Sequence, residues 1–497
     1  MNTALLTGRY TLEYARRPIN LVLLVVVPVV FVVLAAGAIT DFAGLVGGVG
    51  DGSALAAPTA AWAAAFLAGV AGFFHVIGSA GADRRLAGSG YGAVRVVVAR
   101  MVSGLGLALT ASAGALVALM FRTSVADPLW AVAGTVMAGA IYVAIGVVVG
   151  SVMQSEINGS LVVIFVWMVD VFLGPAMAGS DIAVTRLFPT HFVTLIMMDL
   201  PSGHAGPLGD TGWALIWALG SLTVAGVVFT AATRPPRSVT VSLPGWAKRL
   251  GAALRYGMRE YRRNVAMWIM LAAMPVFFIT LSIAVTPAVP SPVRLTDAGS
   301  RVLRMVSMAD IHGAIMVPIT VAFLAGLAGL FVVQGSREAD RRLAVAGFRS
   351  WEILGARLGV IALAAVLTSA VSLAITAVDF VPSDWPLFAT STVIVALTYG
   401  MLGVLAGSVF GRLGGLYVMF LVPFIDIGIA QNVMFSASPP AWGAILPGRG
   451  AVQLLVDAAF TRSFDQGRAL LLAAVWLIGV TAVAAAVFHR VSEPHRA

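Results

Sequence analysis

Few residues of this 497-residue chain have the types and spacing that catalysis would need. A nucleotide-binding P-loop requires a lysine that reaches the phosphates, and the single lysine, Lys248, is followed by Arg249 rather than Ser or Thr. The patterns HExxH and GxSxG do not occur, and the lack of cysteine excludes disulfides, thiolate metal sites and cysteine nucleophiles. The sequence therefore predicts no catalytic residue, no metal site and no ATP hydrolysis by this chain.

Two carboxylates lie where water should be scarce. Asp170 and Asp426 sit inside the apolar runs WMVDV and FIDI. An acid deep in a bilayer costs roughly 2.5–3.5 kcal/mol, so it should face the protein interior or water. A functional role is the first hypothesis, and a structural hydrogen bond is the alternative. For His75, at the inner end of another apolar run, packing is favoured over a proton relay.

The elements that position these residues are predicted to be membrane helices. Sixty per cent of the residues are hydrophobic and 11% are charged, against about 25% charged in soluble domains. This balance excludes a soluble enzyme, a nucleic-acid-binding domain and a disordered chain. Since about 20 apolar residues span a bilayer, we predict an all-α polytopic protein with twelve spans. They lie near residues 19–39, 60–79, 94–120, 129–152, 159–178, 212–232, 264–286, 311–333, 352–378, 386–409, 414–435 and 467–488.

The loops between these segments alternate in charge. Arginines gather before the first span and after the second, sixth and eighth, whereas the opposite loops carry mainly aspartates. The positive-inside rule assigns the basic loops to the cytoplasm. The sequence thus predicts a cell-membrane protein with both termini cytoplasmic, and the net charge of +9 is matched to anionic lipid rather than to nucleic acid.

The chain contains an internal repeat. Residues 66–100 and 323–357 align without a gap, with 19 of 35 positions identical. The repeat continues outward, where EYAR at 13–16 matches EYRR at 260–263, and Asp170 matches Asp426. We predict two six-span halves, residues 1–240 and 241–497, with parallel orientation and a pathway between them.

Three features recur in both halves. Each half opens with a basic amphipathic stretch that suits a helix in the headgroup plane. Each carries the loop ADRRLA, at 82–87 and 339–344, whose charged face and Leu knob suit docking to a partner; shared ancestry plus topology is the alternative. Each has an external stretch, near 187–197 and 445–455, that reads as a half-embedded amphipathic helix.

This order of features resembles the transmembrane permease of type-2 (ABC-2) ATP-binding-cassette exporters. The fused twelve-span form is similar to actinobacterial permeases for polyketide or polyether antibiotics, of the tetronasin type. The resemblance implies two copies of a separate cytoplasmic ATPase subunit that hold ATP and Mg, and a hydrophobic or amphiphilic substrate such as an antibiotic, drug or lipid-like compound. It implies efflux across the membrane and a role in drug or antibiotic resistance.

The resemblance also implies roles for particular residues. The elbow helices would contain Glu13, Tyr14 and Arg16, and Glu260, Tyr261 and Arg263. The coupling helices that contact the ATPases would use Asp83, Arg84, Arg85 and Leu86, and Asp340, Arg341, Arg342 and Leu343. The substrate path between the second and fifth spans of each half would involve Asp170, Asp426, Phe74 and Phe331.

Two other function classes stay open at this point. A proton-coupled twelve-span secondary carrier also has parallel halves, but its GxxxDRxGRR loop is not met because Ser79 and Ser336 occupy the glycine position. Such a carrier would use Asp170 or Asp426 as its proton site. A membrane scaffold or lipid enzyme would need neither a paired ATPase nor transport.

Overall fold

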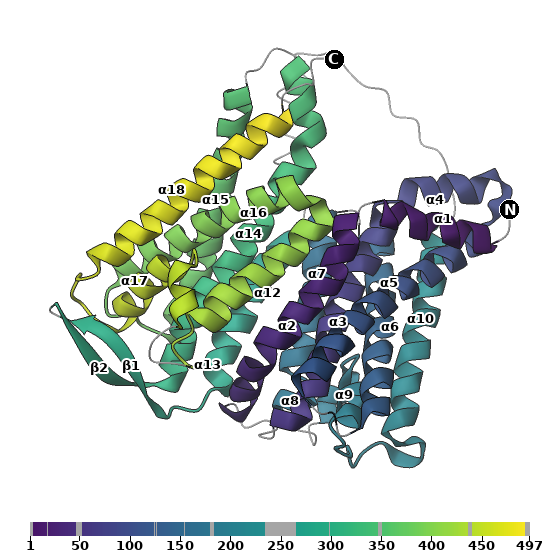
Figure 1. The fold of residues 1–497 in the computed structure, drawn as a ribbon, viewed down its shortest axis with the longest axis horizontal. Helices are drawn as coiled ribbons and strands as arrows, with labels where there is room; N and C mark the ends of the chain where they lie inside the picture. The colour runs from purple at the N-terminus through teal and green to yellow at the C-terminus, as the bar shows by residue number, and fades with distance from the viewer. Residues whose placement is uncertain are drawn as a thin grey trace.

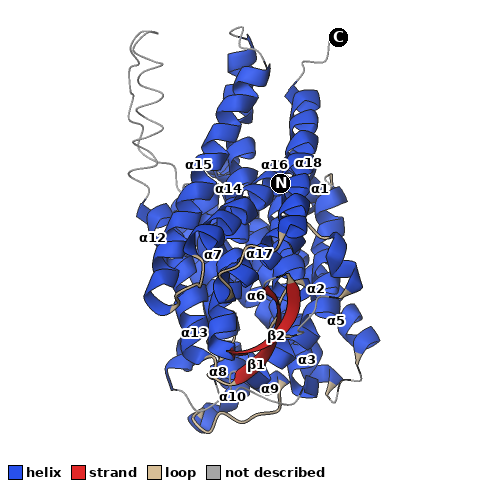
Figure 2. Cartoon of the chain, turned by 90° about the vertical axis from the view of Figure 1, so that its left-hand side faces the viewer, coloured by secondary structure: helices blue, strands red, loops and turns tan. Residues whose placement is uncertain are grey.

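The computed structural model describes residues 3–492 apart from 17, 46–51, 124, 126, 154, 179–182, 234–264, 298, 346–349 and 436–439. Apart from one hairpin, the regular structure of these residues is helical (Figures 1 and 2). The predicted elbow residues Glu260, Tyr261 and Arg263 lie outside the described residues.

The N-terminal half forms the purple-to-teal helices of Figure 1. A helical pattern is expected here because in lipid every backbone polar group must be paired within the segment. The helices are α1 Thr3–Ala15, α2 Pro18–Leu45, α3 Gly52–Ile77, α4 Ala80–Leu86, α5 Ala93–Arg122, α6 Pro128–Val152, α7 Glu156–Phe172, α8 Pro175–Ala178, α9 His191–Met197 and α10 Gly209–Thr233.

The C-terminal half forms the teal-to-yellow elements of Figure 1. It comprises α12 Val265–Pro275, the π-helical turn η4 Val276–Thr280, α13 Leu281–Val285, β1 Pro290–Asp297, β2 Ser300–Ser307, α14 Met308–Val345, α15 Ser350–Asp379, α16 Trp385–Pro423, the π-helical η5 Phe424–Ala430, α17 Arg449–Phe460 and α18 Gly467–Ser492.

Ten helical segments of the described residues are long and apolar enough to cross a membrane. They agree in position with the predicted spans, with two differences. The predicted seventh span is a shorter apolar helix, Ile269–Val285, and the predicted tenth and eleventh spans fall within one 46-residue segment, Trp385–Ala430. The membrane character of the chain is confirmed, and the count of twelve stays a prediction.

The 46-residue segment reverses direction at one glycine. Gly411 has φ 73°, a left-handed value that a residue with a side chain rarely adopts. A Cβ on Gly415 would lie 3.2 Å from the carbonyl oxygen of Ala406, whereas residues nine apart in a continuous helix are about 13 Å apart along its axis. The stretches before and after Gly411 therefore lie side by side.

Glycines let two pairs of long helices touch backbone to backbone. A Cβ on Gly146 of α6 would overlap the carbonyl oxygen of Gly69 in α3, and a Cβ on Gly403 of α16 would overlap that of Gly326 in α14. The second pair follows the first at an offset of 257 residues. In lipid, helices associate mainly through close van der Waals packing, which small residues permit. These glycines therefore let α3 pack closely against α6, and α14 against α16.

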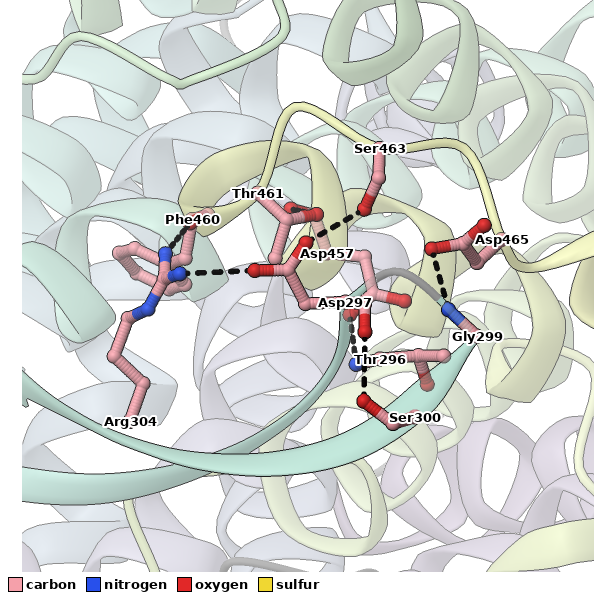
Figure 3. Close-up of polar contacts among 10 residues, drawn as sticks. All are labelled: Thr296, Asp297, Gly299, Ser300, Arg304, Asp457, Phe460, Thr461, Ser463 and Asp465. Carbon is pink, nitrogen blue, oxygen red and sulfur yellow. Dashed lines mark hydrogen bonds and ion pairs between the residues drawn. The ribbon is translucent and has the colours of Figure 1, made fainter.

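A β-hairpin joins α13 to α14 and was not anticipated. Val293 and Leu295 of β1 point inward and their neighbours outward, which is the alternation of a half-buried strand. The hairpin contacts α17 and the loop after it (Figure 3). The Thr296 amide donates to Asp457 Oδ1 at 3.2 Å, Ser463 donates to Asp297 at 2.9 Å, and the Gly299 amide donates to Asp465 at 3.1 Å.

The hairpin corrects one expectation about the external helices. The sequence predicted that α9 and α17 would be half-exposed amphipathic helices. Instead every residue of α17 from Gly450 to Phe460 except Gln453 is buried, and so are the first five residues of α9. Neighbouring elements, including the hairpin over α17, cover the face that was expected to meet solvent.

Candidate functional site: a cavity between the two halves

A cavity of about 440 Å³ lies where the two halves meet. Its N-terminal wall comes from α2, α7, α8 and Leu173, and its C-terminal wall from η4, α13, α14, the end of α16, η5 and the residues after η5. The lining residues are Phe31, Ala38, Ile39, Trp167, Met168, Val171, Phe172, Leu173 and Met177 on the first wall, and Phe277, Phe278, Leu281, Ser282, Val285, His312, Met316, Ile319, Phe323, Phe420, Pro423, Phe424, Gly428, Asn432, Met434 and Phe435 on the second. No Asp, Glu, Lys or Arg is among these lining residues.

Aromatic rings from both halves pack at one end of this cavity. Phe66 of α3 stacks on Phe420 of α16 with ring centroids 3.9 Å apart, and Trp167 meets Phe420 edge to face at 5.4 Å. Phe31 stacks on Phe424 at 5.3 Å. Such contacts add about 0.5–1.5 kcal/mol each beyond buried area. Phe31, Trp167, Phe420 and Phe424 also line the cavity, so these contacts hold the two halves together at its wall.

Polar contacts between the halves continue toward the start of α7 and the Gly411 turn of α16, which the positive-inside rule predicts to lie on the cytoplasmic side. The Tyr417 hydroxyl donates to the Leu67 carbonyl at 3.2 Å. Beyond it, Arg412 forms an ion pair across the interface with Glu156 at the start of α7. Within its own half, Arg412 also donates to the Gln334 carbonyl at 3.4 Å. The interface between the halves is thus closed on this side of the cavity.

The predicted carboxylate Asp170 is buried and fully engaged in hydrogen bonds. It accepts from the Tyr142 hydroxyl at 2.7 Å and from the Thr190 hydroxyl at 2.8 Å. The Thr190 amide, one residue before α9, also donates to it at 3.2 Å. Asp170 therefore joins α6 and α7 to the N-terminus of α9, where a negative charge is favoured.

Asp426 makes the matching arrangement in the second half. It accepts from the Tyr399 hydroxyl and, at 2.7 Å, from the amide of Gly448, the residue before α17. Gln431 donates to it at 3.3 Å. Tyr399 follows Tyr142 by 257 residues, so the same tyrosine–carboxylate–helix clamp occurs twice. This geometry supports the structural alternative for both carboxylates.

None of the four predicted pathway residues lines the cavity. Phe74 contacts Phe73 with ring centroids 4.9 Å apart and is half-buried, and Phe331 is buried in the core. His75 is buried, with its ring edge-on to Tyr10 at 6.4 Å. A pathway role for Asp170, Asp426, Phe74 and Phe331 stays a prediction, and the structure brings other residues together at the interface.

The first ADRRLA loop forms α4, beside α1 (Figure 1). Asp83 is buried, with 1% of its side chain exposed, and receives two hydrogen bonds from Arg100, at 2.9 and 3.0 Å. The Arg100 guanidinium lies 3.7 Å from the ring centroid of Tyr10. Burial raises the pKa of Asp83, which Arg100 opposes, and burial raises the pKa of Tyr10 to about 12.

This network refines the predicted coupling set. Arg84 and Arg85 are exposed and Leu86 is half-buried, so these side chains can meet a partner. Asp83 cannot contact a partner protein in this conformation, because its buried carboxylate accepts hydrogen bonds from Arg100 and Tyr10. The sequence alone placed Asp83 on the docking face, because Arg100, which pairs with it, lies 17 residues further along the chain.

The amphipathic helix predicted at the N-terminus is confirmed as α1. Leu6 and Tyr10 are buried, Tyr14 is half-buried, and Glu13 and Arg16 are exposed. Glu13 lies 3.9 Å from Arg100, so α1 is tied to the α4 network. Burial also raises the pKa of Tyr14.

The second ADRRLA loop has a different backbone. Residues 78–79 separate α3 from α4, whereas α14 continues without a break to Val345 and includes Asp340, Arg341, Arg342 and Leu343. The side chains of these four residues lie outside the described part. Among the described residues no three His, Asp or Glu side chains gather as a metal site would require.

Sequence reasoning missed the residues that build the interface. Glu156 begins α7 and Arg412 directly follows the Gly411 turn. From the sequence, each has only the role of a loop charge that sets the orientation in the membrane. The offset of 256 that matches Asp170 with Asp426 also matches Glu156 with Arg412. Asn432 and His312 are polar residues within apolar runs, a signal that was read only for the carboxylates.

The comparisons with known proteins agree with this architecture. Residues 80–234, which cover α4 to α10, match the family described as ABC-2 family transporter protein. No curated protein matches the chain. Residues 80–234 are thus similar to the membrane part of ABC-2 transporters, and the apolar helices agree with a membrane permease.

Proposed function

We propose that this chain is the permease of an ATP-driven exporter that moves a hydrophobic or amphiphilic compound out of the cytoplasm. The observation that carries the proposal is the family match over residues 80–234, which contain a helix, α4, that presents Arg84 and Arg85 to solvent. The cavity between the halves supplies a site of drug-like size, since ligand pockets are commonly 300–1,000 Å³.

The chain would work as two six-span halves, residues 1–240 and 241–497, with both termini in the cytoplasm. The repeated glycine contacts and the two tyrosine–carboxylate clamps support this division. The tetronasin-type likeness belongs to the same proposal, as does a role in antibiotic or drug efflux. Two ATPase subunits, which bind ATP and Mg, would each contact one ADRRLA segment.

Coupling would be indirect. Closure of the ATPases on ATP would push α4 and the end of α14, and the halves would rock about their interface. The substrate must bind the inward and outward forms with different affinity, because otherwise closure would do no transport work.

The docking prediction is tested by a double variant. Arg84→Ala with Arg341→Ala should lower substrate-stimulated ATPase activity of the reconstituted complex by about tenfold, which is the size of effect expected when two charged contacts are lost. Membrane insertion should be unchanged. Arg122→Ala, an exposed arginine at the predicted outer end of α5, is the control. Unchanged coupling in the double variant would reject the docking role.

A further inference from the structure

The two walls of the cavity differ in chemistry. The N-terminal wall has no side chain free for a polar ligand, because its one polar atom, the Trp167 indole N–H, donates to the Trp62 carbonyl at 2.8 Å. The C-terminal wall carries three uncharged polar side chains, those of Ser282, His312 and Asn432. Apart from this indole, the N–H and O–H groups of the lining side chains therefore come from one half.

The repeat makes this asymmetry specific. At the local offsets of 247, 257 and 256 residues, Ser282, His312 and Asn432 correspond to Ala35, Leu55 and Ala176. The residues on either side of each counterpart are also apolar, so a shift of one residue changes nothing. At these three positions only the C-terminal half has polar side chains.

The polar side chains are held in place by the protein. His312 Nδ1 lies 2.6 Å from the Thr286 hydroxyl, which in turn donates to the Ser282 carbonyl. Asn432 donates to the Gly428 carbonyl at 3.1 Å and accepts from the Met434 amide at 3.0 Å. An amide has two N–H groups and two lone pairs, so Asn432 keeps one donor and one acceptor for a ligand.

We propose that the cavity binds an uncharged amphiphile whose hydroxyl or carbonyl edge faces Asn432, on the wall that also carries Ser282 and His312, and whose apolar body lies against Phe31, Trp167 and Met168. An ionised ligand would be buried without a counter-charge, which is strongly unfavourable. Because the polar side chains lie on one wall only, the ligand should bind in one orientation. This inference rests on the proposed function only for the claim that the bound compound is exported.

The test is equilibrium binding to the protein in lipid nanodiscs without ATP or ATPase, so that a failure of transport cannot affect it. The probes are Nile red, which is uncharged and has a carbonyl; rhodamine 6G, a cation; and anilinonaphthalene sulfonate, an anion. Energy transfer from tryptophan to each dye reports binding, and empty nanodiscs give the background.

We expect saturable binding of Nile red and at least tenfold weaker binding of both ions. Asn432→Ala should weaken Nile red binding about fivefold, the effect of one lost hydrogen bond. The matched control is Asn158→Ala, which removes an equally buried asparagine, also 6% exposed, that does not line the cavity. His312→Leu, which introduces the residue found at the corresponding position 55 of the repeat, makes the C-terminal wall less polar and should also weaken binding.

Two results would overturn the proposal. One is binding of either ion as tightly as Nile red. The other is an unchanged Nile red affinity in Asn432→Ala, a variant chosen because it leaves the cavity free of new bulk. If His312→Leu fails to fold, Asn432→Ala and its control still decide the question. ATP-driven export of an ion that does not bind here would leave the transport function intact and reject only this site.

Discussion

At the scale of single residues, the buried carboxylates act as clamps in this structure. Asp170 and Asp426 each receive a tyrosine hydroxyl and the backbone amide before a short external helix. Burial without these partners would be costly for either charge. Hydrogen bonds within each half therefore offset the free-energy cost of burying each carboxylate in the membrane. A proton-relay role is not needed to explain why the two aspartates are there.

Asp170→Asn should loosen α9 from the bundle. The amide keeps one acceptor but turns an N–H₂ group toward hydroxyl and amide donors, and an unsatisfied buried group costs about 1–3 kcal/mol. We expect hydrogen exchange of residues 191–197 to quicken by tenfold or more. The control is Asp127→Asn, the exposed cap of α6, which accepts from the Leu129 and Trp130 amides. Equal exchange of α9 in wild type and Asp170→Asn would contradict the clamp.

At the scale of elements, the contact between the hairpin and α17 includes a carboxylate with a raised pKa. Burial raises the pKa of Asp457 to about 6, and the nearby charges of Asp465 and Asp297 add to the shift. Arg304 lies on the same hairpin and pairs with Asp297 at 3.1 Å. Asp457 itself accepts the Thr296 amide, so its charge state and the position of the hairpin are linked (Figure 3).

The sign of this linkage follows from the shift. A free aspartate titrates near 3.9, so between about pH 4 and pH 6 the docked hairpin holds a proton that the released hairpin does not. Docking should strengthen as the pH falls from 7 to 5. The chain has no cysteine, so spin labels can be attached at Leu303→Cys in β2 and Leu471→Cys in α18 alone. They measure the distance between the hairpin and α18.

We expect a narrower distance distribution at pH 5 than at pH 8 in the wild-type background. Asp457→Asn, which cannot ionise, should give the same distribution at both values. A pH effect that persists in Asp457→Asn would assign it to another group and contradict the linkage.

The elements also show how far the sequence could predict this structure. The spans were predictable because about 20 apolar residues suffice to mark one locally, and α1 was predictable from its periodic face. The cover over α17 was not, because it depends on a hairpin whose Val293 and Leu295 are too few to mark a strand. The inward turn of Asp83 depends on Arg100, a tertiary partner. The cavity depends on packing between the two halves, and no local pattern in the sequence marks which residues meet there.

At the scale of the whole molecule, the interface between the halves is closed on the predicted cytoplasmic side of the cavity. The stacked rings of Phe66 and Phe420, the Tyr417–Leu67 hydrogen bond and the Glu156–Arg412 ion pair follow one another away from it. Glu156 and Arg412 occupy corresponding positions in the repeat and carry opposite charges. This ion pair lies further from the cavity than the stacked rings, so we expect it to break when the halves separate on this side.

Glu156→Gln should therefore favour opening of this side. The pair is partly exposed, so it is worth about 0–1 kcal/mol, and the open population should rise by up to about fivefold. The readout is labelling of Ser282→Cys, on the cavity wall, by a membrane-impermeant thiol reagent applied from the cytoplasmic side.

The charge swap Glu156→Arg with Arg412→Glu should restore the wild-type labelling rate. Arg304→Gln breaks another partly exposed ion pair, on the hairpin, and should have no effect. If Glu156→Gln and Arg304→Gln alter labelling equally, the pair does not control access to the cavity.

The most direct measurement of the central claim is Nile red accumulation by inside-out membrane vesicles that contain the chain and its ATPase partner. The account predicts accumulation that requires ATP, persists when the proton gradient is collapsed, and disappears when the partner's ATP site is inactivated. Accumulation driven by a proton gradient in vesicles that lack ATP would contradict it and identify the chain as a secondary carrier.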